Sequence, residues 1–187
     1  MREFASAAWA VAGERSGEGG VPLLVRSAPA DLLLRHNRPE SGLHSLELGR
    51  PSLAAALGGV NEAGLAVAGV GGGPGSFRAA ALVGDCLARF ESVAAALDGC
   101  RARRGAGEAE LLFLDARGEI AGLSPDKSGR ALRRPDGCLR AGRVAGALSR
   151  SESRVLLDPR GRRLGLEHPN FERRWVSLSG APHEIKN

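Results

Sequence analysis

The sequence has no tyrosine, and all aromatic residues together make up only 4% of its 187 residues. Apolar residues still account for 43%, so the composition is typical of a globular protein and excludes a disordered chain. We therefore expect a single compact domain over residues 1–187, with a core of Leu, Val and Ala. Because small side chains bury little area each, we expect modest stability.

Lysine is nearly absent too, since only Lys127 and Lys186 occur, and arginine supplies most of the positive charge behind a formal net charge of +5. An arginine-rich nucleic-acid binder and a chain encoded by a high-GC genome both give this pattern. The arginines are scattered, acidic residues lie between them, and no aromatic ladder accompanies them for base stacking. We therefore expect no nucleic-acid partner.

Cysteine is scarce, and Cys86, Cys100 and Cys138 do not have the spacing of a metal site. Four dispersed histidines do not complete one, so we expect no metal and no cofactor. An odd number of widely separated cysteines is typical of reduced thiols in the cytoplasm.

Long apolar runs are also missing, which argues against a membrane span. The short apolar run near the N-terminus is closely bracketed by Glu3 and Glu14 and makes a poor signal peptide. We expect a cytoplasmic protein with no membrane partner.

Apolar runs separated by glycine-rich turns predict strands on both sides of two helices. The stretch SLAAAL at 52–57 fits helix or strand, and the glycines after it favour strand. Expected strands cover 5–13, 21–27, 32–34, 43–48, 52–60, 65–71 and 173–178. Expected hairpins cover 111–123 and 155–166. Expected helices cover 76–90, capped by Ser76, with Phe77, Ala80, Ala81, Leu87 and Phe90 inward, and 92–103, capped by Ser92, with Val93, Leu97 and Cys100 inward. This order predicts an α+β fold in which helices cover antiparallel sheets.

Three turns share a spacing from Asn or Asp to Gly, and we expect a positive φ at or beside Gly64, Gly118 and Gly161. Asn61 is expected to cap the first of these turns. The hairpins around Asp115 and Asp158 both fit Leu-Asp-x-Arg-Gly-x-x-x-Gly-Leu. A duplication explains this repeat, and so does convergence on the same turn chemistry, which we favour.

Two other segments have a functional and a structural interpretation. The glycine-rich stretch GVGGGPGS before a helix fits an anion cradle, but it lacks the lysine of a P-loop and a plain loop is favoured. Glu167 beside His168 fits an acid/base pair, but no nucleophile is identifiable with it, and a hairpin end is favoured.

The segments SAAWAVAGERSGEGGVPLLVRS, GGVNEAGLAVAG and LLFLDARGEI, in this order around the helix pair, resemble the N-terminal nucleophile (Ntn) hydrolases of the choloylglycine hydrolase and isopenicillin N acyltransferase type. The resemblance covers roughly 6–123, and the strand pair at 153–178 extends it. It implies a layered αββα sandwich. It also implies a nucleophile that becomes the first residue after processing, with its own α-amino group as the general base.

Carried onto this sequence, the resemblance places Ser6 at the nucleophile and Arg26 at the family's catalytic arginine. The family's next Asn and Asp are replaced by Ser27 and Pro29, and Gly71 stands where the family has an oxyanion-hole asparagine. Loss of one oxyanion donor alone costs a factor of roughly 10²–10³ in rate.

Five residues precede Ser6 in the sequence, so we expect its nitrogen to be a peptide nitrogen and not a base. The main expectation is an Ntn-fold protein without hydrolase activity that acts as a binding or assembly module. Its partner is then a small acyl-type ligand or another protein, and a homo-oligomer is compatible with the sequence. The alternative is an amidohydrolase or acyltransferase that uses Ser6 after loss of residues 1–5, with Asn61 and Gly71 lining its substrate site.

Overall fold

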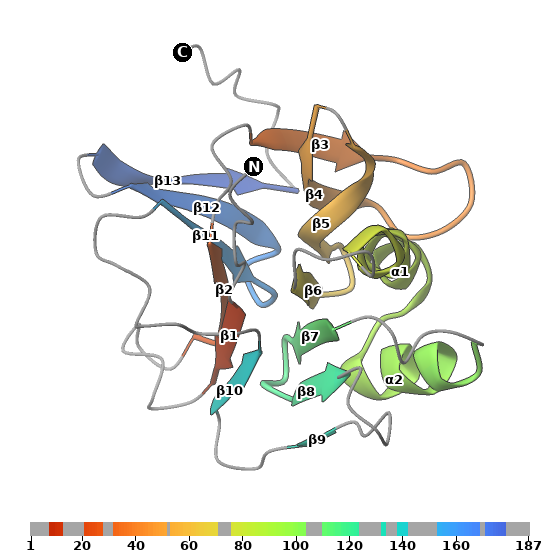
Figure 1. Cartoon of the computed structure of the whole chain (residues 1–187). Helices are drawn as coiled ribbons and strands as arrows, with labels where there is room; N and C mark the ends of the chain where they lie inside the picture. Colours follow the sequence, from red (N-terminus) through yellow and green to blue (C-terminus); the bar gives the residue numbers. More distant parts are fainter. Residues whose placement is uncertain are drawn as a thin grey trace.

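A computed structural model describes residues 8–12, 21–27, 32–51, 53–70, 76–103, 110–123, 132–133, 138–141, 153–168 and 171–178. These residues form two antiparallel sheets and two helices, as expected for an α+β layered sandwich. Figure 1 shows the two sheets facing each other, with both helices beside the second sheet. None of the described helices is long and apolar enough to cross a membrane.

The first sheet has six strands and joins the two ends of the chain. Strands β1 and β2 are neighbouring interior strands, and the late strands lie on both sides of them. Its order is β10 (Cys138–Ala141), β1 (Ala8–Val11), β2 (Leu23–Ser27), β11 (Arg154–Asp158), β12 (Arg163–His168) and β13 (Phe171–Ser177).

The second sheet has seven strands that follow one another in chain order. Residues 53–57 of the ambiguous SLAAAL stretch lie in its third strand, so the strand interpretation is confirmed for these residues. Its order is β3 (Leu33–Asn37), β4 (Ser45–Arg50), β5 (Leu53–Asn61), β6 (Leu65–Val70), β7 (Glu110–Asp115), β8 (Ile120–Leu123) and β9 (Leu132–Arg133).

The two predicted helices are present as α1 (Ser76–Arg89) and α2 (Val93–Arg101). Ser92 caps α2 as expected, since its side chain accepts a hydrogen bond from the backbone N–H of Ala95. Val93, Leu97 and Cys100 face inward as predicted. The prediction for Ala81 was wrong, because this residue is exposed and the buried side of α1 instead includes Ala79, Leu82, Val83 and Cys86.

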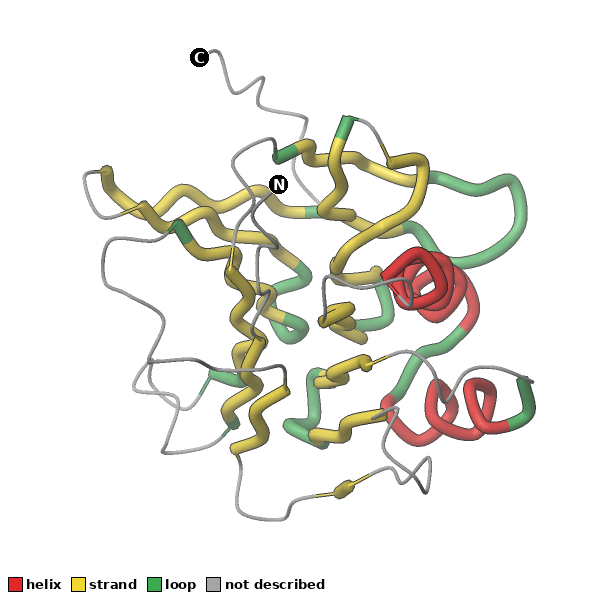
Figure 2. Tube along the Cα trace, viewed as in Figure 1, coloured by secondary structure: helices red, strands yellow, loops and turns green. Residues whose placement is uncertain are grey.

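Strand alternation gives two large cores, and a small third cluster of Leu23, Val25 and Leu156 lies on the other face of β2 and β11. On β6, Leu65 and Val67 face the helices, whereas Ala66 and Ala68 face the other sheet. The helix side holds Phe113, the largest fully buried side chain, and the space between the sheets is filled mainly by Leu, Val and Ala. The layers are helix, sheet, sheet (Figure 2), and among the described residues no helix covers the outer face of the six-stranded sheet.

Two of the three predicted glycine turns have the expected geometry. Gly64 and Gly118 have φ values of 88° and 84°. At the third turn the positive φ of 50° belongs to Arg162, the residue after Gly161. The prediction of a positive φ at or beside each glycine is therefore confirmed, although the third turn uses a different residue.

Candidate functional site

The turn between β5 and β6 is held by Asn61, which is fully buried. Its Oδ1 accepts a hydrogen bond from the backbone N–H of Leu65 at 2.9 Å, which confirms the predicted turn cap. Its Nδ2 donates to the carbonyl oxygens of Leu87 at 2.9 Å and Phe90 at 2.8 Å. The side chain therefore also satisfies carbonyl groups at the end of α1 that the helix itself leaves without partners.

This geometry gives the Asn-Glu-Ala-Gly segment an architectural role. Every polar atom of the Asn61 amide is engaged with backbone groups, on the side of the sheet where the helices lie. Gly64 connects this turn to the turn after β7, because its carbonyl oxygen accepts a hydrogen bond from the backbone N–H of Ala116 at 2.9 Å. A contact between Asn61 and a substrate stays a prediction that the structure does not test.

Arg26 is the second predicted site residue that the structure describes, and it lies near the end of β2. Leu24 of the same strand packs between the sheets, so the period of two places Arg26 on that inner face. Arg26 is only 5% exposed. Ala8 of β1 and Val155 of β11 lie directly opposite it in the two neighbouring strands.

The guanidinium of Arg26 has unused hydrogen-bonding capacity. Nε and Nη1 are both buried and have no hydrogen-bond partner. Burial, followed by the positive charge of Arg50, lowers the pKa of Arg26 from its ordinary value to about 10. A buried cation with free donors and a second cation nearby is an environment that favours an anion.

The structure does not bring all the predicted site residues together. Arg26 faces the space between the sheets, whereas Asn61 faces the helices across the seven-stranded sheet. Ser6, Pro29 and Gly71 lie outside the described residues, as does the glycine-rich stretch before α1.

The hairpins at Asp115 and Asp158 share a sequence pattern, but the hydrogen bonds of the two aspartates differ. Asp115 Oδ1 accepts from the backbone N–H groups of Arg117 and Glu119. Asp158 Oδ1 accepts from Gly161, and its Oδ2 accepts from Arg163 Nε at 2.7 Å. The two hairpins also lie in different sheets.

A polar cluster on β3 and β4 was not identified from the sequence. Glu47, which is 6% exposed, accepts hydrogen bonds from Asn37 Nδ2 at 2.8 Å and Ser45 Oγ at 3.0 Å. Arg35 Nη2 lies 4.0 Å from its other oxygen. The cluster depends on the register of β3 against β4, in which Arg35 lies opposite Glu47 and Asn37 opposite Ser45, and local periodicity does not predict that register.

The remaining candidates offer little reactive chemistry. Glu167 forms ion pairs with Arg154 at 3.8 Å and Arg173 at 2.9 Å, which favours a structural role for this carboxylate. Within the described part of the chain, no group of three or more His, Cys, Asp or Glu residues is placed to hold a metal ion. Arg26 is therefore the described residue whose surroundings most favour a ligand.

No protein-family model matches the chain, and no curated protein sequence matches it significantly. Solved structures do. Penicillin V acylase from Agrobacterium tumefaciens superposes with a TM-score of 0.59 at 12% identity, covering 92% of this chain and 86% of the acylase. A variant of conjugated bile acid hydrolase from Clostridium perfringens gives a TM-score of 0.49 at 13% identity, covering 71% of this chain and 52% of the hydrolase. Both neighbours are Ntn hydrolases, and the superposition on the acylase shows that this chain has the Ntn-hydrolase fold.

Proposed function

We propose that this chain is a catalytically silent Ntn-fold protein that binds a small acylated molecule through the carboxylate of that molecule, with Arg26 as the anchoring cation. The observation that carries the proposal is the pair of buried, unpartnered donors on Arg26. A guanidinium presents its donors in a planar fork that matches the two oxygens of a carboxylate. A bound carboxylate would offset the cost of burying the charge.

The lack of turnover is supported by the sequence around the expected nucleophile. Five residues precede Ser6, so its nitrogen is a peptide nitrogen in the intact chain. A serine hydroxyl without a nearby base stays protonated near pH 7. Pro29 and Gly71 also replace the carboxylate and the oxyanion donor that the resemblance implies. The fold is then retained for binding.

A second candidate function is amide hydrolysis or acyl transfer by a chain that begins at Ser6. One observation favours it: Ala8 lies directly opposite Arg26, and Ser6 precedes Ala8 by two residues. Strand β1 and the arginine strand are thus neighbours, which is the arrangement that a nucleophile on the first strand would require. Trimming residues 1–5 would free the amine that serves as base.

Calorimetric titration with a panel of N-acylated amino acids tests the binding proposal. We expect the wild-type chain to bind panel members and the corresponding carboxamides to bind at least about tenfold more weakly, because the amide removes the charge. Arg26→Met should lose the affinity. Arg174→Met, at an exposed position on β13, is the matched control and should retain it. Equal affinity of wild type and Arg26→Met would refute the proposal.

Turnover distinguishes the two candidate functions. The intact chain, a chain beginning at Ser6, and Ser6→Ala are incubated with the same acylated amino acids and with acylated peptides, and released amine is measured. We expect no turnover by the intact chain. Turnover by the trimmed chain alone would support the second candidate, and turnover by the intact chain that Ser6→Ala abolishes would show that the protein is not silent.

A further inference from the structure

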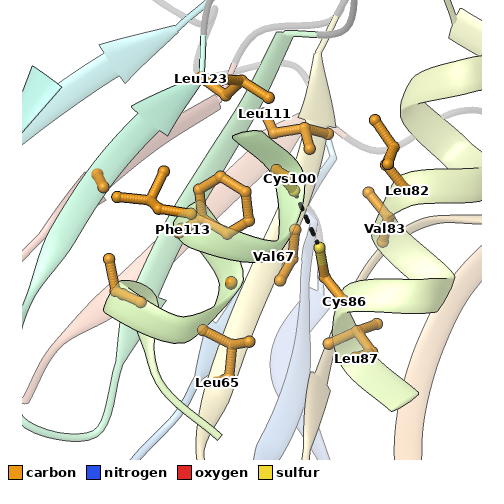
Figure 3. Close-up of a cluster of buried hydrophobic side chains, with 14 of the residues drawn as sticks. Leu65, Val67, Leu82, Val83, Cys86, Leu87, Cys100, Leu111, Phe113 and Leu123 are labelled. Carbon is orange, nitrogen blue, oxygen red and sulfur yellow. Dashed lines mark hydrogen bonds between the residues drawn. The ribbon is translucent and has the colours of Figure 1, made fainter. Parts of the chain in front are cut away.

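Two thiols that neither the turns nor Arg26 require meet inside the helix–sheet core. Cys86 Sγ of α1 and Cys100 Sγ of α2 lie 3.5 Å apart, and one donates a hydrogen bond to the other (Figure 3). Each residue is 1% exposed, and both cysteines are free. A disulfide has a sulfur–sulfur distance of about 2.05 Å, so the sulfurs need to approach by about 1.5 Å.

The surroundings of the pair assign different roles to the two sulfurs. The hydrogen bond from Cys86 lowers the pKa of Cys100 and burial opposes this; the charge of Arg103 acts with the hydrogen bond, and the charge of Asp85 acts against it. The same hydrogen bond and burial raise the pKa of Cys86. Arg103 is held beside the pair by an ion pair of 2.6 Å with Asp85. Either thiol can donate this hydrogen bond, and the lowered pKa favours Cys100 as the attacking sulfur.

We propose that Cys86 and Cys100 form an oxidative modification site, in which hydrogen peroxide or an organic hydroperoxide converts the two thiols into a disulfide that links α1 to α2. With hydrogen peroxide, the Cys100 thiolate attacks one peroxide oxygen, the O–O bond breaks, and the departing hydroxide takes a proton to become water. The product is a sulfenic acid on Cys100. Cys86 Sγ then attacks Cys100 Sγ, the S–S bond forms, the S–O bond breaks, and the second oxygen leaves as water with the Cys86 proton. The two sulfurs lose two electrons in total and the peroxide gains them.

Burial controls the rate of this reaction. A thiol enclosed in a core reacts only when the core opens, because the oxidant must reach the thiolate. Because α2 has nine residues and α1 has fourteen, we expect α2 to be the helix that opens. We expect the oxidation rate to level off at high peroxide concentration, because opening of the core then limits the rate. We expect the rate to rise in low urea, because urea promotes opening.

The Cys86–Cys100 disulfide would link the two helices and would lie away from the proposed ligand site at Arg26. The disulfide would close a loop of the chain between α1 and α2, which reduces the conformational freedom of the unfolded state. For a chain of this size we expect the melting temperature to rise by about 5 °C. Arg26 lies on the other side of the seven-stranded sheet, so ligand affinity should be the same before and after oxidation.

Peptide mapping of the full chain tests the site. The protein is treated with hydrogen peroxide, quenched, unfolded, alkylated with iodoacetamide and cut with trypsin. Arg89 separates the two cysteines, so the expected product is peptide 79–89 joined to peptide 90–101. Intact mass should fall by about 2 Da, the mass of two thiol hydrogens.

Single substitutions supply the controls. Cys138→Ser should keep the mass loss and the linked peptides, whereas Cys86→Ser and Cys100→Ser should abolish both. The wild-type map keeps the test valid even if a core variant folds poorly. Recovery of both cysteines as alkylated thiols, a linkage to Cys138, a disulfide between molecules, or sulfinic acid at either position without the linked product would each overturn the proposal.

Discussion

Gly64 is a residue at which the backbone and its neighbours both exclude a side chain. Its φ of 88° lies in the left-handed region, and an added Cβ would lie 2.8 Å from the carbonyl oxygen of Pro159. We expect Gly64→Val to lower the free energy of unfolding by at least about 1 kcal/mol. Urea unfolding followed by the fluorescence of Trp9 and Trp175 measures this, and the lack of tyrosine keeps the signal simple. An unchanged midpoint would show that the turn tolerates a side chain.

Gly84 is the contrasting glycine and gives a prediction of opposite sign. It lies inside α1, and an added Cβ would meet nothing within 4 Å. Glycine in a helix interior costs about 0.5–1 kcal/mol relative to alanine. Gly84→Ala should therefore stabilise the chain by this amount in the same urea experiment. A loss of stability would mean that α1 is packed more tightly than the structure shows.

At the scale of elements, Asp115 ties the β7–β8 hairpin to the start of α2. Its Oδ1 holds the turn, and its Oδ2 accepts from the backbone N–H of Val93 at 3.3 Å. Asp115→Asn can keep the turn with its single carbonyl oxygen, but its NH₂ group offers no acceptor to Val93. We expect a loss of about 1–3 kcal/mol, with hydrogen exchange accelerated mainly in α2. Asp115→Ala should also accelerate exchange in the hairpin; identical exchange in the two variants would contradict this division of roles.

Elements with strong local signals were predictable from the sequence. The Ser92 cap, the strand–turn–strand pattern around Asn61 and the helix pair each follow from residues that are close in the chain. Features that depend on packing were not. The Cys86–Cys100 contact requires two helices to meet, and the Glu47 cluster requires the pairing of β3 with β4. Local periodicity contains no information about either contact.

The candidate site was predictable only in part, for a similar reason. Arg26 was identified by resemblance, but its burial and unpartnered donors depend on the stacking of two sheets. The role of Asn61 was likewise only half visible, since the cap on Leu65 is local and the bonds to the end of α1 are not. The exposure of Ala81 shows that a local prediction can also be wrong. The buried face of α1 inferred from the sequence differs from the face that packs against the sheet.

At the scale of the whole molecule, Arg26 is a charged group within an otherwise apolar interface between two sheets. Leu24, Val155 and Leu157 belong to the same buried cluster on that inner face. Of the described residues, no carboxylate pairs with the Arg26 guanidinium, and burying such a charge is costly unless it gains partners. The unliganded fold therefore has a built-in cost, which a bound anion would offset.

This cost predicts how the stability of the unliganded chain depends on pH. Arg26→Met removes a buried charge and should raise the free energy of unfolding at pH 7 by about 1–3 kcal/mol. The pKa of Arg26 is lowered to about 10 in the folded chain, so between about pH 10 and the ordinary pKa of arginine the unfolded chain binds more protons. Stability of the wild type should then rise with pH in that window, and below it the full cost is present. The advantage of Arg26→Met should stay constant up to about pH 9 and shrink above pH 10, since both proteins share all other titrating groups. Urea unfolding of both proteins across this range measures the difference, and a methionine variant that is less stable at pH 7 would show that the guanidinium has partners in the unliganded fold.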